Sequence, residues 1–404
     1  DEFLMRTRTQ TSEWLAKTYS NELEGHENSE GRLTTSLCED VFSLMSIHLN
    51  TIRQRLSKKS DALVVVTCLM FSQLRLRQIE SRDTFLKDIE TCCAAANDFQ
   101  RMGEKCEDIL QEILDESDFP EGSIGNLEAS ANELLALYSA DSVYAAQKAH
   151  LFVFRDIEEN ITDLFEAEWE SELTHNEMAL SLTQTLEDFM GDFERFLDDF
   201  MLKKTVDALV TSSVLFYVRT LLLKSEKHNS NRVSYFQDNE VALQRIDGDI
   251  HIIRNYFEGY IDGMPALKKV IEKDFEILTT IQELLRIAAG FSESDAGDFI
   301  CVMHKRIKDV DITKNFVGDL WHLIQPTQER MAFELVESME ENLEALCPSD
   351  GSASKNVKDR MNVPGLRIDE MLAKMYVKSE RKRPKANAME RLAKNWKANW
   401  ITEE

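Results

Sequence analysis

The chain contains few of the residues that interrupt helices. Its 404 residues include six prolines and fourteen glycines, and no proline lies between Pro120 and Pro265. Strand-and-turn architectures rarely tolerate such a long interval, because their tight turns depend on these two residues. This scarcity predicts an all-α protein.

Cysteines are also too few and too scattered to form a framework. The chain has seven, an odd number, and none forms a CxxC pair. This pattern indicates neither a disulfide scaffold nor a zinc site, and it fits a reducing cytosol. The cysteines are Cys38, Cys68, Cys92, Cys93, Cys106, Cys301 and Cys347.

The usual enzyme signatures are absent as well. The chain has no GxxxxGK[ST] loop, no GxGxxG after a strand, no HExxH and no GxSxG. His150, the pair Cys301 and His304, and the neighbours Asp198 and Asp199 each lack the further partners that a metal site or a nucleophile needs. We therefore interpret them as packed or solvated structural residues. We expect no catalytic residue, metal, cofactor or small-molecule substrate.

Positive charge is scarce over most of the chain. Asp and Glu number 73 against 47 Lys and Arg, which gives a net charge of −26 and makes general binding to nucleic acid unfavourable. We find no apolar run long enough to span a bilayer, and the first ten residues lack the apolar core of a secretory signal.

Long apolar stripes at helical spacing are abundant. The region 141–173 contains no glycine or proline, and its apolar and small residues recur three or four apart. Around position 152, large apolar residues occupy all faces of the predicted helix, which indicates that other helices cover it on several sides. Such a helix would be roughly 50 Å long, and we expect an elongated rod of stacked antiparallel helical bundles.

Further helices are predicted on both sides of this central one. Residues 62–71 are rich in β-branched side chains, but their apolar length favours a buried helix over a strand. The polar stretch 24–31 reads as a loop, and Thr174 with Glu177 has the spacing of a capping box. Ahead of residue 228 we expect helices at 1–23, 35–56, 82–116, 127–138, 177–204 and 206–224, and one that Asp61 caps and that contains the apolar stretch 62–71. Beyond it we expect helices at 236–261, 265–289, 293–308, 313–324, 327–346 and 367–377.

The polar loop 228–232 is the predicted boundary between two parts of the chain. Residues 1–228 form the first helical bundle or bundles, 229–378 the second bundle, and 379–404 a basic tail. From Lys374 to Lys397 nine positive residues stand against two glutamates, a local charge of +7 that leaves about −33 elsewhere.

This tail has two interpretations. It can form a basic amphipathic helix on an anionic membrane surface, or it can serve as a solubilising arm that docks on the acidic bundles. The candidate contact residues are Lys378, Arg381, Lys382, Arg383, Lys385, Arg391, Lys394, Trp396, Lys397 and Trp400.

Several extended segments resemble one known family. They occur in the family's order and look like the C-terminal half of the Sec6 subunit family of the exocyst, also called exocyst complex component 3. The segments are 96–109, 141–179, 216–228, 246–260, 285–290, 298–309, 318–326 and 364–376.

This resemblance implies a non-catalytic subunit of the exocyst. Such a subunit helps to tether secretory vesicles to the plasma membrane before SNARE-mediated fusion, and it is cytoplasmic and peripheral at sites of exocytosis. The implied partners are the other exocyst subunits and a plasma-membrane SNARE of the SNAP-25 type. A helical adaptor or small-GTPase effector is the alternative, because helical folds of this kind do not fix a function.

Overall fold

The computed structural model describes residues 2–20, 25–55, 59–116, 121–167, 169–170, 176–225, 233–290 and 320–324. These residues form helices and one short β-hairpin, which confirms the predicted all-α class. The chain packs as two compact units, Asp1–Glu159 with Gln184–Leu209, and Asn160–Thr183 with Val210–Glu404. Helices α5, α6 and α7 each contribute residues to both.

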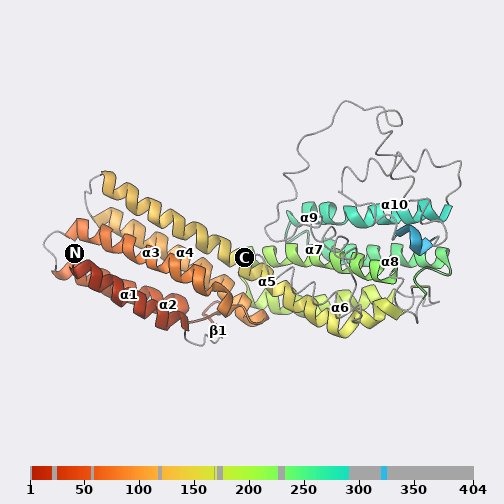
Figure 1. Ribbon diagram of the computed structural model, residues 1–404, viewed down its shortest axis with the longest axis horizontal. Helices are drawn as coiled ribbons and strands as arrows, with labels where there is room; N and C mark the ends of the chain where they lie inside the picture. The colour runs from red at the N-terminus through yellow and green to blue at the C-terminus, as the bar shows by residue number, and fades with distance from the viewer. Residues whose placement is uncertain are drawn as a thin grey trace, which may run out of the picture. The chain divides into compact units, whose positions relative to one another are not determined.

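The first unit is a bundle of long helices that lie side by side (Figure 1). It contains α1 (Glu2–Ser20), α2 (Leu37–Arg55), α3 (Lys59–Phe85), α4 (Ile89–Glu116) and most of α5 (Glu121–Ala167). Its core includes fully buried aromatic side chains, among them Phe71, Phe99 and Phe154. On α4 the small buried run from Cys92 to Ala96 lets the neighbouring helices approach closely.

Helix α3 confirms the helical interpretation of its β-branched run. Val64 and Val66 are buried, and the Thr67 hydroxyl donates to the Leu63 carbonyl at 2.8 Å within the same helix. Tertiary packing thus overrides the strand propensity of these residues. Other side chains of α3, however, are exposed, so the helix is not covered on all sides by the described residues.

Helix α5 is longer at its start than predicted and runs for 47 residues. The predicted helices 127–138 and 141–173 are joined, because Asp141 does not cap a new helix. Its buried carboxylate instead accepts hydrogen bonds from Gln78 at 2.9 Å and Arg82 at 3.0 Å, both on α3. The described helix ends at Ala167.

The break between helices α6 (Glu177–Phe196) and α7 (Asp199–Lys224) lies closer to the N-terminus than predicted. The sequence placed the break near residue 205, whereas it lies at Leu197 and Asp198. The buried Asn97 amide donates to the Phe196 carbonyl at 2.7 Å and accepts from the Asp198 N–H at 3.2 Å. A side chain about one hundred residues away therefore supports this break, and local sequence gives no sign of it.

The second unit contains the end of α7 packed with α8 (Asn239–Glu258), α9 (Leu267–Asp274) and α10 (Glu276–Gly290). The predicted helix 265–289 is divided at Phe275. Asp238 caps α8 by accepting from the N–H groups of Glu240 and Val241. Residues 320–324 form a buried helical turn whose Leu323 carbonyl accepts from the Phe236 N–H at 2.7 Å.

Two helices reach membrane-spanning length, contrary to the expectation from the apolar runs. The stretches Ala62–Phe85 and Asp199–Leu222 both have a mean hydropathy of 1.3. In the second stretch, 94% of its apolar 18-residue window is buried inside the protein, as expected for a core helix of a bundle.

Several predicted features lie outside the described residues. They are the capping threonine Thr174, the boundary loop 228–232, the helices 293–308, 327–346 and 367–377, and the basic tail.

Candidate functional site

A short β-hairpin lies beside the middle of α4, in the region predicted as a loop. Strand β1 (His26–Glu27) pairs antiparallel with β2 (Leu33–Thr34). The Asn28 side chain accepts from the Glu30 and Arg32 N–H groups, both at 2.9 Å, and closes the turn. Gly31 has a φ of 79°, a left-handed conformation that favours glycine.

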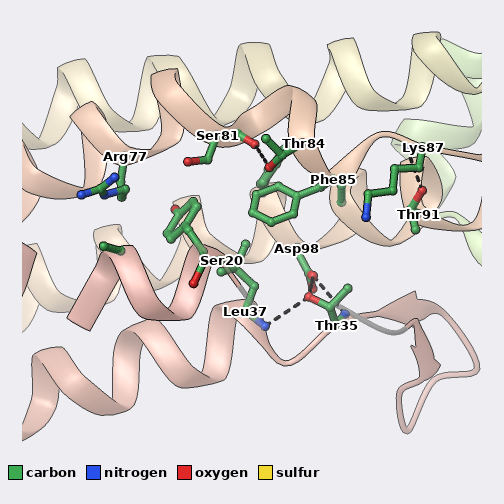
Figure 2. A pocket seen from close by; sticks show the side chains of 14 residues that line it. Ser20, Thr35, Leu37, Arg77, Ser81, Thr84, Phe85, Lys87, Thr91 and Asp98 are labelled. Atoms are coloured by element: carbon green, nitrogen blue, oxygen red, sulfur yellow. Dashed lines mark hydrogen bonds between the residues drawn. The ribbon is translucent and has the colours of Figure 1, made fainter. Parts of the chain in front are cut away.

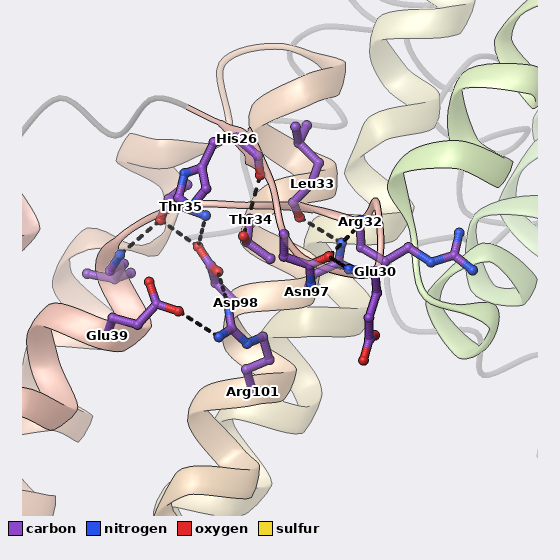
Figure 3. A network of polar contacts seen from close by, with 12 residues as sticks. His26, Glu30, Arg32, Leu33, Thr34, Thr35, Glu39, Asn97, Asp98 and Arg101 are labelled. Carbon is purple, nitrogen blue, oxygen red and sulfur yellow. Dashed lines mark hydrogen bonds and ion pairs between the residues drawn. The ribbon is translucent and has the colours of Figure 1, made fainter.

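Asp98 of α4 connects this hairpin to the start of α2 (Figure 3). Its Oδ2 accepts from the Thr35 N–H at 2.9 Å and from the Thr35 hydroxyl at 2.5 Å. The same hydroxyl oxygen accepts from the Leu37 N–H at 3.1 Å, so Thr35 caps the first turn of α2. Asp98 thereby holds the helix cap in place.

Burial raises the pKa of Asp98 to about 7, although the Thr35 hydrogen bonds act in the opposite direction. Arg101 also favours the charged form, with its guanidinium 4.0 Å from Oδ1 of Asp98. Arg101 in turn pairs with Glu39 of α2 at 2.7 Å. The network joins α4 to both sides of the Thr35 turn.

Asn97 adds a second connection from the same turn of α4. Its amide donates to the Leu33 carbonyl of β2 at 2.8 Å, in addition to its bonds at the α6–α7 junction. Arg32, from the hairpin turn, donates to the Glu194 carbonyl of α6 at 2.6 Å. The hairpin is therefore attached to three helices by polar contacts.

A groove of about 760 Å³ lies next to this network and is lined from α1, α3, α4 and the Thr35 turn (Figure 2). Its lining includes the cations Arg77 and Lys87 and several hydroxyl groups. The hydroxyls of Ser20 and Thr84 donate to carbonyls of their own helices, at 2.9 and 2.5 Å. The Thr35 hydroxyl is bonded to Asp98 and caps α2, so the groups on this groove support the fold.

In the part of the chain that the structure describes, the buried Asp98 carboxylate accepts the hydrogen bond of the Thr35 hydroxyl. That hydroxyl oxygen also accepts from the Leu37 N–H, so the pair is engaged in capping α2. Over the described residues, no group of three or more His, Cys, Asp or Glu side chains is placed to hold a metal ion.

Comparison with known families identifies the chain. A family model described as exocyst complex component Sec6 matches residues 1–290. The chain belongs to the exocyst Sec6 family.

A solved structure supports the same fold. It is described as the crystal structure of the C-terminal domain of the exocyst subunit Sec6p, with a TM-score of 0.64 and 13% sequence identity. The match covers 85% of this chain and 92% of that one. Comparison with the curated proteins gave no significant match.

Several chemically reactive or large side chains of this Sec6-family chain are buried in its core, although Phe200 and Val65, which the sequence also placed in buried stripes, are exposed. His150 is buried on α5, and burial lowers its pKa to about 3, which keeps the imidazole neutral. Burial raises the pKa of Cys38 and Cys92 to about 12, as expected for packed, unreactive thiols. Trp321 is 2% exposed and belongs to the core rather than to a free surface.

The acidic pair Asp198 and Asp199 lies where α7 begins, with Asp198 part buried at the α6–α7 break. The Asp199 side chain is 85% exposed and pairs with Arg32 at 3.4 Å. Cys301, His304 and the ten candidate residues of the basic tail lie outside the described residues.

Sequence reasoning missed one feature of α3. Val65, Leu76 and Ile79 are large apolar side chains that face solvent in the described structure. These residues are spaced three or four apart or by sums of these steps, but α3 is apolar on its other faces as well, so the sequence did not predict which face is exposed. We call the line of Val65, Leu69, Ser72, Leu76 and Ile79 the α3 stripe.

Proposed function

We propose that this protein is a subunit of the exocyst of the component 3 type. It acts as a non-catalytic scaffold that helps to tether secretory vesicles to the plasma membrane before SNARE-mediated fusion. Its partners are the other exocyst subunits and a plasma-membrane SNARE of the SNAP-25 type. It works in the cytoplasm, peripherally at sites of exocytosis.

One observation carries this proposal. The Sec6 family model matches 290 consecutive residues, which include the whole of the first unit and the second unit as far as residue 290. The family name denotes a component of a complex, so assembly with other subunits is the expected role. The buried polar groups around Asp98 and Asn97 are engaged in holding helices together, which agrees with a structural part of an assembly.

Affinity purification tests the proposal directly. The full-length protein would be tagged in its own cells and recovered under mild salt, and its partners identified by mass spectrometry. Recovery of sister exocyst subunits in comparable amounts supports the scaffold role. Recovery of a small GTPase or a cargo protein without those subunits favours the helical adaptor instead.

The basic tail supports a second, separate part of the proposal. We propose that residues 379–404 contact anionic lipid, because their cationic side chains are interspersed with Trp396 and Trp400. A peptide of residues 374–404 should bind phosphatidylserine or phosphoinositide liposomes and not neutral ones, and Trp396→Ala with Trp400→Ala should abolish this. If deleting the tail from the intact protein leaves its sedimentation with anionic liposomes unchanged, the tail is a solubilising arm.

A further inference from the structure

The α3 stripe exposes large apolar side chains along one face of one helix. The exposed fraction is 44% for Val65, 51% for Leu76 and 54% for Ile79. Between them, Ser72 is exposed and Leu69 is half-buried. Single exposed apolar residues are common on proteins, whereas three large ones aligned on one helix face, with the part-exposed Leu69 between them, are typical of an interaction surface.

The spacing of the stripe fits an α-helix as its occupant. Successive members are separated by 4, 3, 4 and 3 residues, the alternation of a coiled-coil seam. The stripe spans roughly 21 Å at 1.5 Å per residue, or about four helical turns. A partner helix with apolar residues at the same alternation would place its side chains between these, and the small Ser72 leaves room for a large side chain opposite.

Charge next to the stripe indicates what kind of helix fits. From Ala62 to Ile79 the sequence contains Arg75 and Arg77 and no Asp or Glu, although the chain as a whole has a net charge of −26. Arg75 lies 3.4 Å from Glu133, and Arg77 lies 3.0 Å from Glu80. Arg77 lines the groove between α1, α3 and α4, whereas Arg75 is exposed next to the stripe. An exposed pair contributes little stability, so Arg75 can turn to a carboxylate of a partner at small cost.

A membrane surface fits these observations less well. Helices that lie on membranes present tryptophan or phenylalanine together with a row of cations. The α3 stripe has no aromatic member, and the one phenylalanine within its span, Phe71, is buried in the bundle. A narrow seam of aliphatic residues matches a helix better than a bilayer.

We infer that the α3 stripe is a docking surface for an acidic amphipathic helix of another exocyst subunit. This inference rests on the proposed function for the identity of the partner. The exposed aliphatic side chains supply the apolar seam, and Arg75 selects a carboxylate on the flank of the incoming helix.

The test places two carboxylates on the seam of the tagged full-length protein. Leu76→Glu with Ile79→Glu should leave the melting temperature nearly unchanged, because both side chains are half exposed. It should lower recovery of at least one sister subunit by roughly tenfold or more, the effect of losing central apolar contacts. Ile47→Glu is the matched control, since Ile47 on α2 is 57% exposed and lies outside the stripe. Equal recovery with both variants, or an equal loss, would overturn the inference.

A photo-crosslinking residue at Ser72 identifies the occupant independently. We expect crosslinks to a segment of an exocyst subunit that has heptad-spaced apolar residues and a net negative charge. Crosslinks to a second copy of this chain, or no crosslinks at all, contradict the inference. It is also contradicted if the double variant Leu76→Glu with Ile79→Glu loses only its binding to liposomes. If the unaltered protein recovers no exocyst subunit, the proposed function fails, while a crosslink to an acidic heptad helix of another protein still supports the docking surface.

Discussion

Helices α3 and α7 have the same hydropathy and different surroundings. The stretches Ala62–Phe85 and Asp199–Leu222 are equally long and share a mean hydropathy of 1.3. Yet 94% of the apolar 18-residue window within the α7 stretch is buried inside the protein, against 44% of the corresponding window of α3. The apolar residues of α7 are therefore part of the core, whereas a share of those on α3 face outward.

This difference shows what composition alone does not reveal. A helix that is apolar all round has no dominant face, so its sequence does not say how many neighbours cover it. The arrangement of charge separates the two helices better. The acid-free segment of α3 carries the exposed Arg75 beside exposed aliphatic side chains, while Arg219 lies in the buried part of α7.

The largest expected effect is on α7. Leu221 is fully buried, so Leu221→Asp removes a packed side chain and places a carboxylate where water does not reach. Such a change costs more than about 4 kcal/mol, a large part of the stability of a typical domain. We expect insoluble or unfolded protein, measured by soluble yield and circular dichroism. A normal cooperative melt would place Leu221 at the surface.

An equally buried aromatic residue extends the test to α5. Phe154→Asp should unfold the first unit for the same reason, because Phe154 is fully buried. Phe200→Asp is the matched control, since Phe200 is 51% exposed at the start of α7. Limited proteolysis of the two variants should show rapid cleavage of the first and near-normal resistance of the second. The same outcome for both would contradict the assignment of the core.

The third effect concerns buried carboxyl groups. Each unit has one: Asp98 on α4 in the first unit and Asp274 on α9 in the second. Asp274 accepts from Thr211 of α7, and Asp98 of α4 accepts from Thr35; burial raises the pKa of both carboxyls. The folded pKa of Asp98, about 7, exceeds the reference value of 3.8. Between these values the folded state holds a proton that the unfolded state has lost, so stability falls as pH rises from about 4 to 7.

Replacing Asp98 with Asn should remove this pH dependence. Relative to the unaltered protein, Asp98→Asn should be more favourable at pH 8 than at pH 5 by about 3 kcal/mol, because roughly two pH units separate pH 5 from the folded pKa of Asp98, which is about 7. Denaturant unfolding at several pH values measures the difference. Asp199→Asn, at an exposed position, controls for the loss of one charge. A difference that does not change with pH would show that Asp98 is charged throughout.

The general class of the fold was predictable, but its helix boundaries were not. Scarce proline and glycine with apolar spacing of three or four residues were enough to predict helices, including α3 despite its valines. The continuous α5 depends on Asp141 bonding to α3, and the α6–α7 break depends on Asn97 of α4. The candidate surface could not be predicted either, because exposure of the α3 stripe depends on where the other helices pack.

Asn97 provides a direct test of such a long-range contact. Asn97→Leu keeps a similar volume but leaves the Leu33 and Phe196 carbonyls without this donor. The loss should be about 1–3 kcal/mol, the cost of leaving buried polar groups unsatisfied. Chemical denaturation measures it, with Asn132→Leu at an exposed site of α5 as control. No difference between the variants would mean that water replaces the amide.

The smallest expected effect completes the comparison on α3. Leu76→Asp makes the same chemical change as Leu221→Asp, but on a side chain that is 51% exposed. The new carboxylate is solvated and lies between Arg75 and Arg77, so only the lower helix propensity of aspartate opposes it. We expect a loss below about 1 kcal/mol, seen as a shift of a few degrees or less in the melting temperature. If Leu76→Asp unfolds the protein as Leu221→Asp does, other parts of the chain cover the α3 stripe. A stable variant leaves the stripe open to a partner, because its apolar residues are then not required by the fold itself.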